Sequence, residues 1–146
     1  MRIDELDDFI IEIMKKRVID PYHDIPYLAG YNKDGTIIYI DKDCPYFFKG
    51  FPIYQLLIIH EHVEKNEIDK GVHYQAAHQT ALITEKIACT SLGLSWNEYD
   101  LYMKKKIKTA AHEQLENVPD DLDFTPYLDE HDYEELKRMF SSKRVH

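Results

Sequence analysis

The sequence predicts an α+β fold that is mostly helical, in a single domain spanning residues 1–146. Three patterns predict it: an amphipathic N-terminal segment, a pair of β-prone runs around an Asp-Gly turn, and two long helical segments after them. Within the domain we distinguish a core over residues 1–93 from a helical extension over residues 94–146. A chain of this length buries about 68–70% of its unfolded surface, which is enough for a hydrophobic core.

The N-terminal segment is expected to form a helix over about residues 3–17, because its apolar side chains fall on one stripe at helical spacing. The residues of this stripe are Ile3, Leu6, Phe9, Ile10, Ile13 and Met14. Asp20-Pro21 should end the helix, since proline disfavours the helical conformation of the residue before it.

A β-hairpin is expected next, because two short β-prone runs, residues 27–31 and 36–40, flank a turn sequence. The turn contains Asp34-Gly35, which supplies the positive φ angles of a tight hairpin. A loop over residues 41–50 follows, and its aromatic residues are expected to anchor in the core. The predicted sheet is therefore small and antiparallel.

Two long helices are expected over about residues 52–70 and 74–92. Pro52 suits the first turn of the first helix, and Gly71 and Gly93 suit the positions just after the two helix ends. Because the connection between the helices is short, we expect them to pack as antiparallel neighbours. These two helices carry the candidate metal ligands.

The C-terminal extension is also expected to be helical. Residues 95–98, Ser-Trp-Asn-Glu, form a capping-box sequence that predicts a helix from there to about Glu116. An acidic loop over residues 119–126 should separate it from a final short helix over about residues 129–140. No known family resembles residues 95–146.

Composition and charge exclude several classes of protein. Acidic residues outnumber basic ones by 27 to 18, and the resulting net charge of −9 would repel a nucleic-acid backbone. The longest apolar run, residues 56–59, is far shorter than the ~20 residues of a membrane span. The N-terminus is acidic rather than a basic leader, and the two cysteines form no Cys-x-x-Cys pair. We therefore expect an acidic cytoplasmic protein without a nucleic-acid or membrane partner.

Titratable residues concentrate at the end of the apolar stripe of the helix predicted over residues 52–70. His60 and Glu64 are four residues apart and share that face, whereas His62 points away and is expected at the surface. A buried imidazole and carboxylate need partners, because an unpaired buried charge costs several kcal/mol. A metal ion is one such partner, and a metal-free hydrogen-bonded pair is the alternative.

The following helix offers further candidate ligands. His78 and Glu85 are seven residues apart, almost two turns, so they share a face. Counted outward from the turn, Glu85 should lie level with His60, while His78 lies nearer Glu64. Whether one ion collects all four side chains, or only one of His78 and Glu85 in addition to the first pair, stays open from the spacing.

The segment His60-Glu61-His62-Val63-Glu64 resembles the H-E-x-x-H signature of the zincin metallopeptidases, with a glutamate in place of the second histidine. The order of helix, strand and metal-site helix is also similar to small zincin-like domains, including hypothetical proteins encoded by phages and prophages. The resemblance covers about residues 1–92.

The resemblance implies a role for each matching residue. His60 and Glu64 would be metal ligands, and Glu61 would be the general base that accepts a proton from metal-bound water. Glu85 would be the third ligand, supplied by the following helix as in one branch of the zincins. His78 would restore a second nitrogen ligand to a set that is otherwise rich in oxygen.

The resemblance implies a small zinc-dependent hydrolase, a metallopeptidase that acts on a peptide or protein substrate. Zn²⁺ is the expected cofactor, with Mn and Fe ions as alternatives for an oxygen-rich ligand set. Two other functions stay open: a metal-stabilised interaction module without catalysis, and a metal-free helical adaptor. A catalytic site would keep one coordination position open, whereas a structural site would be closed by protein ligands.

Overall fold

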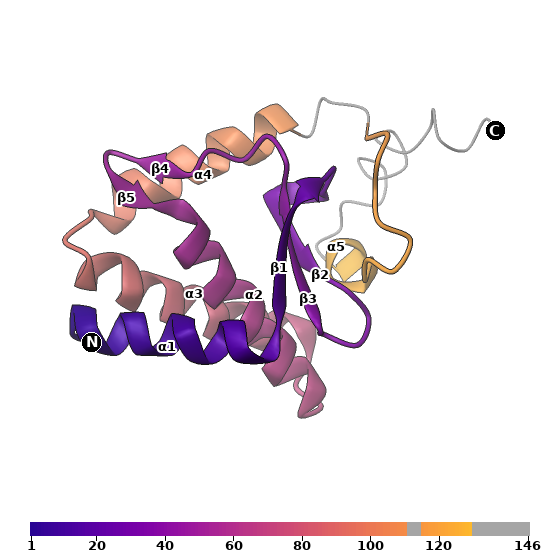
Figure 1. Cartoon of the computed structure of the whole chain (residues 1–146), viewed down its shortest axis with the longest axis horizontal. Coiled ribbons are helices and arrows are strands. Elements are labelled where there is room, and N and C mark those ends of the chain that lie inside the picture. Colours follow the sequence, from indigo (N-terminus) through magenta and orange to yellow (C-terminus); the bar gives the residue numbers. More distant parts are fainter. Residues whose placement is uncertain (111–114, 130–146) are drawn as a thin grey trace.

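The computed structural model describes residues 1–110 and 115–129 and confirms the α+β class (Figure 1). Helices pack around a small three-stranded sheet in the order β1-β3-β2, and a separate two-stranded sheet lies near α4. In the described residues the elements are α1 (Ile3–Lys16), β1 (Val18–His23), the 3₁₀ helix η1 (Pro26–Leu28), β2 (Ala29–Tyr31), β3 (Ile37–Asp41), β4 (Phe47–Phe48), β5 (Phe51–Pro52), α2 (Ile53–Asp69), α3 (Tyr74–Ser91), α4 (Trp96–Ala110) and α5 (Thr125–Asp129).

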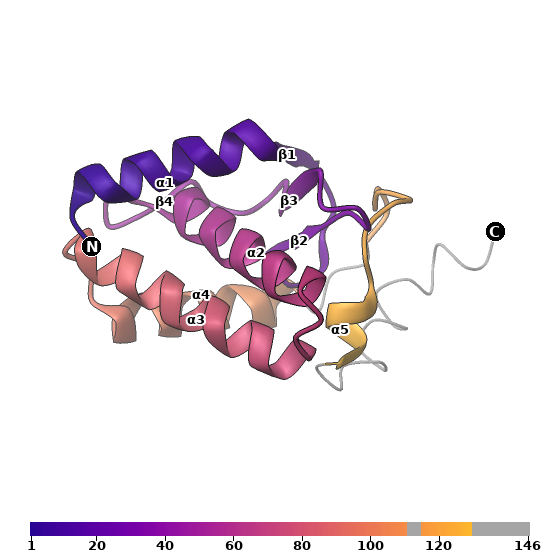
Figure 2. The same ribbon diagram turned by 90° about the horizontal axis from the view of Figure 1, so that it is seen from below.

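The N-terminal helix forms as predicted. Leu6, Ile10 and Ile13 bury its apolar stripe, and the helix ends at Lys16, after which Arg17 takes an extended conformation. Figure 2 shows α2 lying between α1 and α3, so α2 packs against a helix on each side. This central place explains why α2 carries buried polar residues on more than one face.

The predicted hairpin is confirmed, because β2 and β3 pair antiparallel around a turn in which Gly35 has a φ of 77°. The prediction of a purely antiparallel sheet is wrong, because β1 pairs parallel to β3. This strand contains Pro21, which lies between the two register positions Asp20 and His23, where the pairing is irregular. An edge strand tolerates proline there because no neighbour needs its missing N–H group.

The loop predicted over residues 41–50 contains the start of a second hairpin, β4–β5. Its two turn residues, Lys49 and Gly50, both have positive φ angles, as a tight hairpin turn requires. Of the aromatic residues expected as core anchors, only Phe48 packs against the core, while Tyr46 and Phe47 are exposed. These strands are too short for a periodic signal.

The helices after the sheet agree with the prediction over α2, α3 and the start of α4. Gly71 and Gly93 take left-handed conformations just after α2 and α3. The fourth helix buries Tyr99 and Met103 in the main core. Its predicted end at Glu116 is wrong, because residues 115–118 form no helix.

Residues 115–129 cover the face of the sheet opposite α2, together with the outer edge of β2. Leu122 and Tyr127 pack with Tyr39 in a second small core. The Asp123 N–H group and the Tyr127 hydroxyl donate hydrogen bonds to outward carbonyl oxygens of β2. A backbone group and a side chain of the C-terminal segment thus find partners on β2.

The final helix predicted over residues 129–140 lies outside the described residues, apart from its first position. No helix in the described part of the chain combines the length and the apolar character that a membrane crossing requires.

Candidate metal centre

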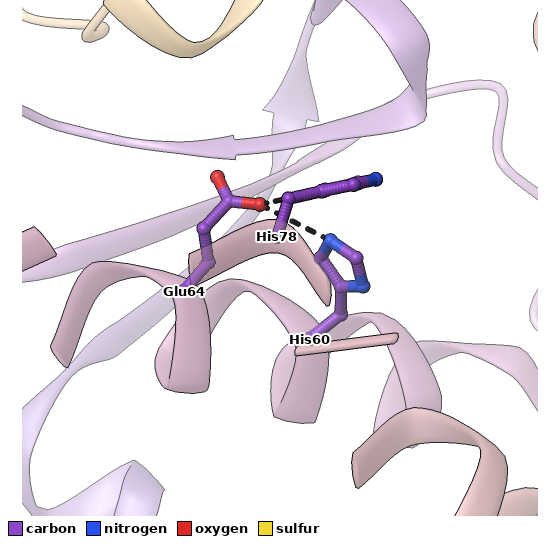
Figure 3. Close-up of side chains that lie close together, drawn as sticks. All are labelled: His60, Glu64 and His78. Atoms are coloured by element: carbon purple, nitrogen blue, oxygen red, sulfur yellow. Dashed lines mark hydrogen bonds and ion pairs between the residues drawn. The ribbon is translucent and has the colours of Figure 1, made fainter. Parts of the chain in front are cut away.

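Three of the predicted side chains converge between α2 and α3. His60 and Glu64 lie one turn apart on α2, and His78 comes from the first half of α3 (Figure 3). One donor atom from each lies within 4.8 Å of the other two. Two nitrogens and one oxygen therefore face a common point, as the helical spacing and the short connection at Gly71 predicted.

The carboxylate of Glu64 is at the centre of this group. Its Oε2 atom lies 3.0 Å from Nδ1 of His78 and 3.3 Å from Nε2 of His60. The two imidazole rings meet edge to face, with their centroids 5.0 Å apart. His60 and Glu64 are buried, with exposed fractions of 8% and 3%, whereas His78 is partly exposed. The group is therefore open to solvent on the side of α3.

Glu85, the fourth predicted ligand, lies in the same cluster but outside this group of three. Its Oε1 atom is 2.8 Å from Nδ1 of His60, the ring nitrogen opposite the one that faces Glu64. The predicted heights of these residues along the two helices are confirmed, since Glu85 contacts His60 and His78 contacts Glu64. Spacing along the helices could not show which nitrogen of His60 each carboxylate approaches.

Two buried tyrosines complete the cluster, and sequence reasoning missed both. Tyr31 of β2 donates a hydrogen bond of 2.9 Å to Oε1 of Glu64, and Tyr99 of α4 donates one of 2.7 Å to Oε2 of Glu85. A buried tyrosine hydroxyl usually has a hydrogen-bond partner. Nothing in the sequence distinguishes these two among the eleven tyrosines, because their partners lie more than ten residues away.

The electrostatics of the cluster favour charged carboxylates. Burial alone would lower the pKa of His60, but hydrogen bonds to Glu64 and Glu85 outweigh it and raise that pKa well above its ordinary value. Burial opposes ionisation of Glu64 as well, yet its hydrogen bonds with His60 and His78 lower its pKa to about 2. Glu64 is therefore an anion, the state that a metal ligand requires.

The predicted general base, Glu61, lies beside this group. It is buried and directly follows His60 on α2. Glu61, His60, Glu64 and His78 all line a pocket of about 780 Å³. Apolar side chains from α3 and α4, among them Leu82 and Met103, also line it. A small molecule or part of a peptide fits a pocket of this size.

His62 does not lie at the surface as expected. It is buried on the opposite side of α2, where Nδ1 accepts a hydrogen bond of 2.9 Å from Nε of Arg17. The prediction is wrong because α1 covers this face of α2, and the direction of a side chain around one helix does not show what packs over it. His62 takes no part in the metal group.

Comparison of the chain with protein-family models, curated proteins and solved structures gives no match. The chemistry of the site is therefore inferred from its own atoms. Two imidazoles and one carboxylate form a ligand set that catalytic zinc sites use, and they leave a fourth position for water or substrate.

Proposed function

We propose that His60, Glu64 and His78 bind a divalent metal ion, best matched by Zn²⁺, and that the protein is a metal-dependent hydrolase. The observation that carries the metal site is the convergence of three donor atoms within 4.8 Å. Around Zn²⁺, bond lengths of ~2.0–2.1 Å place tetrahedral ligand atoms about 3.3 Å apart. The separations of 3.0 and 3.3 Å between Glu64 and the two histidines are close to that value.

The surroundings favour a catalytic site over a structural one. Three protein ligands leave the fourth tetrahedral position open, whereas a structural zinc site is closed by a fourth protein ligand. The three side chains also line the pocket of about 780 Å³, so a substrate could reach that position. A bound metal ion would lower the pKa of a water ligand and polarise a carbonyl group.

Glu61 is the proposed general base. It follows His60 on α2, lines the same pocket, and is itself buried. A carboxylate in this place can accept a proton from the attacking water and pass it to the leaving group. The pocket's apolar walls can hold a side chain of a peptide substrate, so we propose a peptidase as the type of hydrolase.

Zinc titration of chelator-treated protein tests the metal site. We expect one equivalent of Zn²⁺ to bind, and we expect His60→Ala to lose stoichiometric binding. Glu67→Ala is the matched control, because Glu67 is on the same helix but outside the group, where it pairs with Lys70. Absence of stoichiometric binding in the unaltered protein would contradict the metal site.

Glu61→Gln tests catalysis separately from binding. We expect the zinc content to be unchanged and the cleavage of a mixed peptide library to be abolished. If the zinc content also falls, Glu61 is a ligand rather than the base. If the unaltered protein binds zinc but cleaves no peptide, the ion serves structure, as in a metal-stabilised interaction module.

A further inference from the structure

Two carboxylates that contact His60, Glu64 and Glu85, share one pattern of contacts. Each has one oxygen bound by a buried tyrosine hydroxyl and the other oxygen close to a nitrogen of His60. The tyrosine and the carboxylate come from different elements in both cases. His60 is therefore held between two tyrosine–carboxylate pairs, Tyr99–Glu85 on the Nδ1 side and Tyr31–Glu64 on the Nε2 side.

From this geometry we propose that Glu85 and Tyr99 are positioning residues that orient His60 toward the metal ion, and that Glu85 is not a ligand. This inference rests on the proposed metal site. Both oxygens of Glu85 are already engaged, Oε1 with His60 at 2.8 Å and Oε2 with Tyr99 at 2.7 Å. Oε1 of Glu85 faces Nδ1, on the side of the His60 ring away from Glu64, and Glu85 lies outside the group of three donor atoms that meet within 4.8 Å.

The contact with Glu85 also decides which nitrogen of His60 can bind metal. A carboxylate accepts hydrogen bonds, so the facing Nδ1 atom carries a proton. Nε2 faces Oε2 of Glu64 in the group of three, so both ring nitrogens carry a proton while no metal is bound. The proton of Nε2 would leave on metal binding, and Nδ1 would keep its proton in the contact with Glu85. A carboxylate behind a metal-binding histidine fixes both the tautomer and the orientation of the ring.

Burial makes the arrangement persistent. Glu85 is 5% exposed and Tyr99 is 1% exposed, so water does not compete for their contacts. Burial, together with the charge of Glu85, raises the pKa of Tyr99, and the phenol therefore remains a hydrogen-bond donor. The chain of contacts runs from α4 through α3 to α2, so it also fixes the relative positions of three helices.

Tyr31 has the matching effect on the ligand Glu64. Its hydroxyl engages Oε1 at 2.9 Å, which leaves Oε2 as the atom that faces both histidines. Glu64 is therefore set to bind the ion through one oxygen. The cluster as a whole presents three single donor atoms and an open fourth position.

Zinc affinities of three variants of the full chain test the proposal. Loss of a group behind a metal ligand typically weakens metal binding by 10–100-fold. We therefore expect Tyr99→Phe and Glu85→Gln to raise the Kd for Zn²⁺ by about 10–100-fold while one equivalent still binds. Tyr102→Phe is the control, because this tyrosine lies on the same helix with its ring stacked on Phe48, outside the cluster. It should leave the Kd unchanged.

A spectroscopic measurement separates positioning from a general structural effect. In the zinc-loaded protein, ¹⁵N-labelled His60 should show a protonated Nδ1 with slow solvent exchange and a metal-bound Nε2. Tyr99→Phe should speed the exchange of that proton, and Tyr102→Phe should not. Zinc bound through Nδ1 of His60 would overturn the proposal.

Loss of all zinc binding in Glu85→Gln, equal to the loss in His60→Ala, would also overturn it and make Glu85 a ligand. A failure of the metal site itself gives a different result, because the unaltered protein would then bind no zinc and the inference would fall with it. Unchanged zinc affinity in both Glu85→Gln and Tyr99→Phe would contradict the positioning role alone.

Discussion

His60 and His62 are two residues apart on α2, yet they lie in opposite environments. His60 faces α3, where it contacts two carboxylates, and its pKa is raised. His62 faces α1, where burial first and the charge of Arg17 second lower its pKa to about 4. His60 lies between two anions, of which Glu64 is its proposed partner in metal binding, whereas His62 is a neutral acceptor for a buried guanidinium.

The difference shows that the neighbouring helix, not the residue type, decides the chemistry of a histidine here. Arg17 donates to His62, to the Gly35 carbonyl oxygen and to Oδ1 of Asn66, so it joins α1 and the hairpin turn to α2. We call this the α1-side network. The cluster around His60 links α2, α3, α4 and β2 instead. The α1-side network should control stability, and the cluster around His60 should control metal binding.

The largest expected effect comes from breaking the α1-side network. Arg17→Met keeps the aliphatic part of the side chain but leaves three acceptors without their donor. We expect the free energy of unfolding to fall by about 3 kcal/mol, since each unsatisfied buried group costs about 1–3 kcal/mol and the losses overlap. Urea denaturation measures it.

Zinc affinity provides the contrast for the same variant. Arg17→Met should leave the Kd for Zn²⁺ unchanged, because the three side-chain hydrogen bonds of Arg17 go to His62, Gly35 and Asn66 and not to the group around Glu64. Lys16→Met, at the adjacent exposed position, should change neither quantity. If Arg17→Met weakens zinc binding as strongly as it lowers stability, the two faces of α2 are coupled and the comparison fails.

The second expected effect concerns the face of α2 that packs against α3, where the metal site is proposed. At a free zinc concentration ten times its Kd, the unaltered protein should gain about 1.4 kcal/mol of stability. His78→Ala should show no gain at the same concentration, because it removes one of three ligands. Its metal-free stability should fall, because the buried carboxylate of Glu64 loses one of its partners. Urea denaturation with and without zinc measures both.

His73→Ala is the matched control for this experiment. The imidazole of His73 caps the N-terminus of α3 by accepting a hydrogen bond from the Gln75 N–H group, so its loss should cost about 1 kcal/mol in both forms. The gain on zinc addition should remain. A zinc-dependent gain that survives in His78→Ala would remove His78 from the site.

The third expected effect is a pH dependence of the α1-side network. His62 is neutral in the folded protein down to a pH of about 4, whereas in the unfolded chain it takes up a proton near 6.5. Its contribution to stability is therefore present above about pH 6.5 and is lost as the pH falls from there toward 4. An NMR titration of the His62 ring should show the low pKa. The variant His62→Gln should have a flatter stability profile in this interval, and an ordinary pKa would contradict the assignment.

Local patterns in the sequence determined α1, α2 and α3 and the placing of the two α2 residues of the candidate site. The apolar stripes marked α1 and α2, and the i,i+4 spacing placed His60 and Glu64 on one face, because both depend only on the helical repeat. Gly71 and Gly93 marked the ends of α2 and α3. The short connection at Gly71 brought His78 within reach of Glu64. The Asp34-Gly35 turn predicted the β2–β3 hairpin for the same local reason.

Contacts between distant segments were decided by the tertiary structure alone. The parallel pairing of β1, the burial of His62 under α1, and the approach of Glu85 to Nδ1 rather than Nε2 of His60 all depend on how elements cross. The hydroxyls of Tyr31 and Tyr99 reach their carboxylates across such crossings too. Residue spacing fixes the direction in which each side chain leaves its helix. Packing in three dimensions decides which residue that side chain then contacts.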